Sequence, residues 1–231
     1  MSSAAKKPSV SAGQRRALPE VWPAGQQVGR WYKESVFVTK FADHGAYHEA
    51  LCRKVMALAR DPATGTRFRG EVGSVKVYDV DKWRCPEADL VHARALHLFR
   101  MVTQRQEAVV DLSWASVYRS GDWCMPHSHP RTEASVLYVL DLGDTSDSAS
   151  GRFCFADSRM QMCCREEAGY MSTPCAPPVE AGTMMLFPGQ AIHFVTPYHG
   201  KRPRLTMSWN LNHAAREGEP IPEHIHRPTW D

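Results

Sequence analysis

Two histidines one residue apart, His127 and His129, lie between prolines in the segment Pro126-His127-Ser128-His129-Pro130. Alternate side chains of a β-strand point to the same face, so both imidazoles can reach one metal ion if this segment is extended. The flanking prolines restrict the backbone around the pair. An H-x-H pair is a weak indication in a chain with 11 histidines, so its interpretation depends on the residues that accompany it.

A third histidine follows a predicted turn further along the chain. Phe187-Pro188-Gly189 predicts a tight turn, and His193 lies four residues beyond Gly189. A strand returning from this turn would bring His193 towards the H-x-H pair. Three imidazoles would then form a facial metal site whose remaining coordination positions are open.

Arg204 begins a predicted strand, residues 204–211, in which polar and apolar side chains alternate. On the pattern alone, either face of this strand could be the solvated one. The guanidinium of Arg204 suits bidentate binding of a carboxylate, and the hydroxyl of Thr206 adds a hydrogen bond. A metal site beside such an arginine favours a chelating acid as the ligand. The polar face holds Arg204, Thr206, Ser208 and Asn210, and the apolar face holds Leu205, Met207, Trp209 and Leu211.

The chain changes character near residue 109. Before it, apolar residues at helical spacing predict one helix that follows Asp43 as N-cap and ends near Asp61, and a second that starts near Pro86. After it, short β-rich runs alternate with Gly, Pro and Asp, which predicts a sandwich, barrel or jelly roll. The strands expected after residue 109 cover residues 110–118, 134–142, 151–156, 183–187, 192–196 and 204–211. Before it, residues 35–38 predict a short strand and residues 74–80 an extended segment.

Several of these segments together resemble the 2-oxoglutarate and Fe(II)-dependent oxygenases, particularly a group of bacterial members. The matching segments occur in the family's order over roughly residues 110–212: 118–122, 126–130, 135–140, 150–159, 187–193 and 204–206. The resemblance implies a mainly β fold, a double-stranded β-helix (jelly roll, cupin-like) with supporting N-terminal α-helices. We therefore expect a single oxygenase domain over 29–212, with mainly helical support over 29–108 and a jelly-roll core over 109–212, between a flexible tail (1–28) and a C-terminal tail (213–231).

The resemblance also implies site residues and cofactors. His127 and His193 would be the most secure ligands of Fe(II). Arg204, with Thr206 and the hydroxyl of Tyr118, would bind the distal carboxylate of 2-oxoglutarate as cosubstrate. The implied reaction is hydroxylation, with dioxygen, of an unidentified small molecule or amino-acid side chain, coupled to decarboxylation of 2-oxoglutarate to succinate.

The chain departs from the family pattern at His129, where most members have Asp or Glu. A set of three histidines carries one negative charge less, which should alter the redox behaviour and the metal preference. We favour His127, His129 and His193 as the ligands; Asp157 is the alternative source of a carboxylate. Two other functions stay open: a three-histidine cupin-type dioxygenase that does not use 2-oxoglutarate, and a non-catalytic metal-binding jelly-roll module.

Composition limits the partners and the compartment. The formal net charge is only +3 in 231 residues, so we expect no nucleic-acid partner. No apolar stretch is long enough to span a bilayer and no signal-peptide core is present, so we expect no membrane association and a cytoplasmic protein. The 7 cysteines include no C-x-x-C pair, which is typical of reduced thiols. A homodimer is compatible with the expected edge strands.

Overall fold

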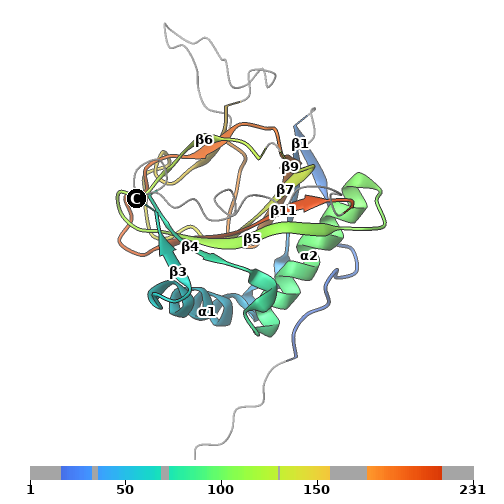
Figure 1. The fold of residues 1–231 in the computed structure, drawn as a ribbon, viewed down its shortest axis with the longest axis horizontal. Coiled ribbons are helices and arrows are strands. Elements are labelled where there is room, and N and C mark those ends of the chain that lie inside the picture. Colours follow the sequence, from blue (N-terminus) through green and yellow to red (C-terminus); the bar gives the residue numbers. More distant parts are fainter. Residues whose placement is uncertain (1–16, 33–35, 69–72, 130, 157–175, 215–231) are drawn as a thin grey trace, which may run out of the picture.

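Two β-sheets face each other across the interior, and two α-helices cover the outer face of the larger sheet (Figure 1). This arrangement is seen in a computed structural model that describes residues 17–32, 36–68, 73–129, 131–156 and 176–214. The expected mainly β jelly roll with supporting helices is confirmed. The division into tails and a domain over 29–212 stays a prediction.

The large sheet has eight strands in the order β1-β2-β9-β7-β11-β5-β4-β3, and all its neighbouring pairs are antiparallel. The small sheet has the order β6-β10-β8. The bounds are β1 Gly29–Tyr32, β2 Val36–Lys40, β3 Gly65–Arg67, β4 Val75–Tyr78, β5 Val109–Tyr118, β6 Cys124–His127, β7 Ala134–Asp141, β8 Phe153–Phe155, β9 Thr183–Pro188, β10 His193–Val195 and β11 Arg204–Asn212.

The helical elements precede most of the strands: η1 Ala42–Ala46, α1 His48–Arg60, η2 Val80–Lys82 and α2 Pro86–Thr103. Pro86 suits the first turn of α2, because its φ is fixed and no intrahelical donor is lost there. Asp43 does not cap α1 as predicted. It lies within η1, Tyr47 is the N-cap of α1, and the Asp43 carboxylate instead accepts hydrogen bonds from the buried Arg94.

The main hydrophobic core lies between the helices and the outer face of the large sheet. The apolar face of β11 contributes to it, and burying each large apolar side chain stabilises the fold by about 1.5–3 kcal/mol. The polar face of β11 therefore points to the space between the two sheets. Buried members of the core include Leu51 and Val55 of α1, Val91, Ala95 and Leu98 of α2, and Leu205, Met207, Trp209 and Leu211 of β11.

Residues 17–28 belong to the segment predicted as a tail, and three of them form contacts with the helical layer. The Arg94 guanidinium donates hydrogen bonds to the backbone carbonyls of Glu20 and Val21 at 2.7 and 2.8 Å. The Trp22 ring lies 5.4 Å from Phe41 and 4.6 Å from His97, centroid to centroid. These contacts arise from the tertiary fold, which the local composition of the segment does not reveal.

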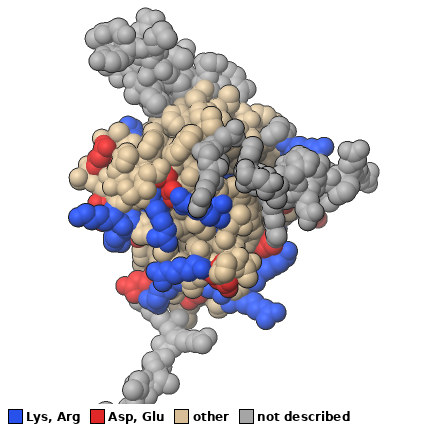
Figure 2. All heavy atoms as spheres, turned by 60° about the vertical axis from the view of Figure 1, so that its left-hand side comes forward, with Lys and Arg blue, Asp and Glu red and all other residues tan. Residues whose placement is uncertain are grey.

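Three strands were not predicted as such: β1, β3 and β6. The other expected strands are present, with ends that differ by a few residues. Within the described residues, no helix combines the length and the apolar character needed to cross a bilayer. Figure 2 shows Lys and Arg side chains interspersed with Asp and Glu over one face of the molecule.

Candidate metal and 2-oxo acid site

His127 and His193 lie opposite each other on neighbouring strands of the small sheet. His193 of β10 pairs in register with His127 of β6, and their ring centroids are 4.2 Å apart. His127 Nδ1 is 2.8 Å from the carbonyl oxygen of Met125, and His193 Nδ1 is 2.9 Å from that of Ala191. A proton on Nδ1 donates to each carbonyl, which leaves Nε2 of both rings free to bind a metal.

His129 reaches the same place from outside the strand. Because β6 ends at His127, the expectation that both histidines share one strand is wrong for His129. The His129 backbone N–H donates to the carbonyl of Gly189 at 2.6 Å. A Cβ on Gly189 would lie 2.1 Å from the Thr132 carbonyl oxygen, so only glycine permits this close approach. The predicted Pro188-Gly189 turn thus places the loop of His129 beside the start of β10.

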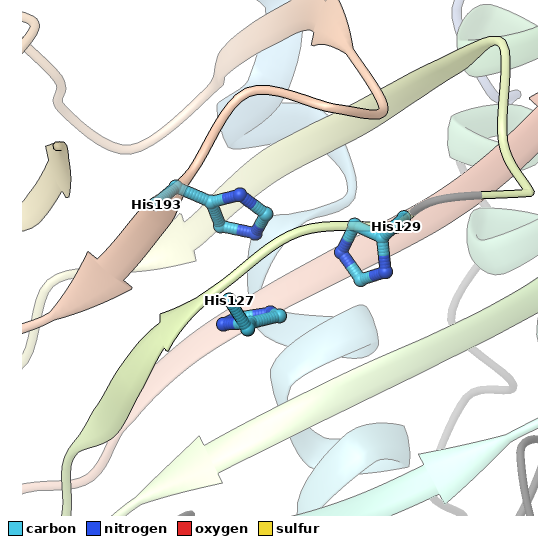
Figure 3. A group of neighbouring side chains, drawn as sticks. All are labelled: His127, His129 and His193. Atoms are coloured by element: carbon cyan, nitrogen blue, oxygen red, sulfur yellow. The ribbon is translucent and has the colours of Figure 1, made fainter. Parts of the chain in front are cut away.

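The three imidazoles converge (Figure 3). The ring of His129 is 5.1 Å from His127 and 5.2 Å from His193, and one nitrogen of each ring lies within 4.8 Å of the others. Burial lowers the pKa of all three, to about 3 for His129 and well below the ordinary value for His193. The rings are therefore neutral at pH 7, with lone pairs available to a metal ion.

Asn210 and Ser135 form a hydrogen-bonded chain behind His129. The side-chain amide of Asn210 is 3.3 Å from His129 Nδ1, and the Ser135 hydroxyl is 3.1 Å from Asn210 Oδ1. An Asn side chain can present either its oxygen or its amino group to the ring. With the oxygen towards His129, Nδ1 donates and Nε2 is left free for a metal, as in the other two histidines.

Arg204 lies in the same pocket, and no residue that the structure describes accepts a hydrogen bond from its guanidinium. Its side chain is 1% exposed, and Nε, Nη1 and Nη2 are all buried without a hydrogen-bond partner in the described part of the chain. The guanidinium carbon is 5.1 Å from the centroid of the Tyr118 ring, and burial lowers the pKa of Arg204. A buried, unpaired guanidinium is costly, so the site is suited to an anion. Thr206 is buried and lines the same pocket.

The pocket between the sheets has a cavity volume of about 40 Å³. It brings together the predicted residues Tyr118, His127, His129, His193, Arg204 and Thr206. Burial raises the pKa of Tyr118, so its hydroxyl keeps its proton and can donate to an anion. Asp157, the alternative metal ligand, lies outside the described residues. No Asp or Glu among the described residues lines the pocket or joins the three imidazoles as a possible metal ligand.

Sequence reasoning missed several lining residues. Ser116 of β5 and Lys76 of β4 face the pocket, and Asn210 contacts His129. The alternation along β11 already placed Asn210 on the polar face, so its contact could have been proposed. Lys76 had no comparable signal, because a lysine within a short alternating run is usually solvated.

Comparisons with known proteins agree with this geometry. Residues 112–210 match the family model described as "Putative 2OG-Fe(II) oxygenase". The search of curated proteins gives no match. Two solved structures share the fold: a Pseudomonas putida prolyl-4-hydroxylase (15% identity, TM-score 0.54, covering 77% of this chain and 92% of the other), and AviO1 from Streptomyces viridochromogenes (15% identity, TM-score 0.59, covering 84% and 95%).

A third similar structure is a Trichoplax adhaerens prolyl hydroxylase in complex with a peptide fragment of hypoxia inducible factor (12% identity, TM-score 0.57, covering 77% of this chain and 84% of the other). The matched family segment contains the three converging histidines and Arg204. Residues 112–210 are therefore similar to the 2OG-Fe(II) oxygenase family, and the chain shares the jelly-roll fold of these solved structures.

Proposed function

We propose that the protein is an Fe(II) and 2-oxoglutarate-dependent hydroxylase of a small molecule, in which His127, His129 and His193 bind the iron. Arg204 binds the distal carboxylate of 2-oxoglutarate, with help from Thr206 and the Tyr118 hydroxyl. Similarity to this family implies Fe(II), 2-oxoglutarate, dioxygen and a small-molecule substrate. The roles of the individual residues are our assignment.

The unpartnered guanidinium of Arg204 carries this proposal. Its three nitrogens are buried and find no acceptor among the described residues, in a pocket that also contains three neutral imidazoles. A metal ion fits the imidazoles, because their lone pairs are free of protons at pH 7. A dicarboxylic 2-oxo acid fits both ends of the pocket, since one end chelates a metal and the other is a carboxylate suited to a guanidinium fork.

When bound, iron and 2-oxoglutarate supply the oxidising chemistry: the keto acid and dioxygen are converted to succinate and carbon dioxide, and one oxygen atom is inserted into a substrate C–H bond. The side chains have other tasks. The histidines hold the metal, Arg204 and Thr206 orient the cosubstrate, and apolar residues exclude water from the reaction. The apolar lining includes Trp114, Val136, Leu137, Phe153, Phe187 and Val195.

Anaerobic addition of Fe(II) and then 2-oxoglutarate tests the proposal. We expect a weak visible absorption band that titrates with 2-oxoglutarate, and succinate formation after dioxygen is admitted. His193→Ala should abolish the band because it removes a ligand, whereas His199→Ala, a substitution outside the pocket, should leave it unchanged. Fully metallated protein that shows no band would contradict the proposal.

The three-histidine ligand set favours one alternative, a cupin-type dioxygenase in which the substrate itself chelates the iron. Arg204 would then bind the carboxylate of that substrate. The two functions differ in the same experiment: oxygen uptake that does not depend on 2-oxoglutarate supports the alternative. Iron-loaded protein that neither consumes oxygen nor binds 2-oxoglutarate would instead indicate a non-catalytic metal-binding module.

A further inference from the structure

Lys76 projects into the same pocket from a strand outside the matched family segment. It lies on β4, where the neighbouring Val77 packs in the core beneath the helices. Because side chains alternate along a strand, Lys76 faces the opposite side, into the space between the sheets. Its Nζ is 5.1 Å from the centroid of the Trp114 ring and 5.5 Å from that of Phe68, and it lines the pocket with the three histidines.

The ammonium of Lys76 has no carboxylate partner among the described residues. The ion pairs formed by those residues do not include it. Burial lowers its pKa, because leaving water disfavours the charged form. The aromatic rings give some cation–π attraction, which is weaker than a full counter-ion. An anionic ligand would supply the counter-ion and so stabilise the buried ammonium.

Lys76 and Arg204 occupy different parts of the pocket. Strands β11 and β4 pair with the two opposite edges of β5. Arg204 of β11 is paired with Tyr118, and Lys76 of β4 is paired with Ser116. The Arg204 guanidinium lies over the Tyr118 ring, whereas the Lys76 ammonium lies over Trp114. These two aromatic residues are four positions apart on β5, which corresponds to about 13–14 Å along the strand. The Trp114 ring is 5.9 Å from that of His129, so Lys76 lies towards the histidine end.

When Fe(II) and 2-oxoglutarate are bound, the positive charge of Lys76 still has no counter-ion among the described residues. The two positive charges of Fe(II) equal the two negative charges of 2-oxoglutarate, and the imidazoles are neutral. Arg204 and Lys76 then add two positive charges with no described acid in the pocket. A site with Asp or Glu in place of His129 would be one charge less positive. A further anion is therefore favoured electrostatically in this chain.

We propose that Lys76 binds a carboxylate of the primary substrate, so that the enzyme hydroxylates a small carboxylic acid. This inference rests on the proposed function and specifies its substrate class. One ammonium matches a single monoanionic carboxylate, and the groups placed against the Lys76 ammonium are the uncharged rings of Phe68 and Trp114. The Trp114 and Phe68 rings hold the Lys76 side chain over the histidine end, which places the acid beside the metal ligands.

Carboxylate binding can be measured on protein loaded with Ni(II), which does not support turnover, in the presence of saturating 2-oxoglutarate. The probes are acetate, hexanoate and benzoate, each paired with its neutral amide, and ligand-observed NMR gives their dissociation constants. We expect at least one acid to bind tenfold or more tightly than its amide. Lys76→Met should remove this preference, and the control Lys82→Met, at an exposed lysine of η2, should retain it.

Several outcomes would overturn the inference. They are equal binding of every acid and its amide, an unchanged preference in Lys76→Met, or tighter binding of phenyl phosphate than of benzoate. Loss of 2-oxoglutarate affinity in Lys76→Met would assign the lysine to the cosubstrate instead. Lys76→Gln serves if the Met variant does not fold.

The proposed function is tested separately. If wild-type protein does not bind 2-oxoglutarate, that function fails. The acid and amide probes can then be compared in Arg204→Met and Arg204→Met/Lys76→Met without 2-oxoglutarate, where Lys76 is the pocket cation that differs between the two variants.

Discussion

Arg204→Met should change cosubstrate affinity and protein stability in opposite directions. The methionine keeps an unbranched side chain but removes the guanidinium, which is 1% exposed and has no hydrogen-bond partner within the described ranges. Removing one partner of a buried, hydrogen-bonded charge pair costs about 2–5 kcal/mol. Since every 1.4 kcal/mol is about tenfold in affinity, 2-oxoglutarate should bind roughly thirtyfold to several thousandfold more weakly.

The ligand-free variant should be at least as stable as the wild type. In the absence of an anion, the wild type keeps an unpaired buried charge, and replacing buried ionic groups by apolar ones of similar volume is often neutral or stabilising by about 1–4 kcal/mol. Thermal unfolding without ligand should therefore give an equal or higher Tm for Arg204→Met. Added 2-oxoglutarate should raise the Tm of metal-loaded wild type and not that of the variant.

The matched control is Arg202→Met, two positions before Arg204. Arg202 is exposed and contacts Asp141 and the Gly143 carbonyl, so its loss should leave 2-oxoglutarate affinity within a factor of two to three of wild type, about 0.4–0.7 kcal/mol. Titration of the anaerobic Fe(II) protein with 2-oxoglutarate measures both variants. If Arg204→Met binds 2-oxoglutarate as tightly as Arg202→Met does, the assignment of Arg204 is refuted.

Four further predictions concern the histidines. His193→Ala should weaken Fe(II) or Ni(II) binding by two orders of magnitude or more, measured by competition with a chromophoric chelator; wild-type affinity would remove His193 from the ligand set. Asn210→Ala should weaken metal binding by about 10–100-fold through His129, while Asn210→Asp, which keeps an acceptor, should lose less; equal losses would contradict this positioning role. Because the pKa of His129 is lowered to about 3, metal affinity should change little between pH 8 and 6, and a tenfold fall over that range would contradict the assigned neutral rings. The same lowered pKa values mean that the unfolded chain takes up protons first, so the free energy of unfolding of metal-free protein should decrease as pH falls from 6.5 towards 3.

The sequence was informative where one local pattern had one physical solution. The strict alternation over residues 204–211 predicted a strand with one apolar and one polar face, and β11 lies between β5 and β7 with its apolar face in the core. The Pro188-Gly189 turn also predicted the return of the chain to His193. The approach of His129 depends on it, since the Gly189 carbonyl accepts the His129 backbone N–H.

Other features depended on contacts between distant segments and had no local signal. Residues 17–28 look like a tail by composition, but the buried guanidinium of Arg94 needs acceptors and finds them in the carbonyls of Glu20 and Val21. Asp43 is a favourable N-cap residue in isolation, but its carboxylate instead accepts hydrogen bonds from the Arg94 guanidinium. In both cases the cost of an unpaired buried charge outweighs the local preference.

Lys76 illustrates the same limit at the site itself. In the run Val75-Lys76-Val77-Tyr78, alternation predicts that Lys76 and the valines lie on opposite faces, and a lysine is ordinarily assigned to solvent. Lys76 instead faces the interior because β4 pairs with β5 in the large sheet, and this pairing places Lys76 in the lining of the pocket. That pairing joins residues about 40 positions apart, so the short run alone could not reveal it. Lys76 lies on β4, the strand next to the edge strand β3, and still lines the pocket. Its electrostatic attraction for an anionic ligand therefore depends on the order of the strands in the sheet.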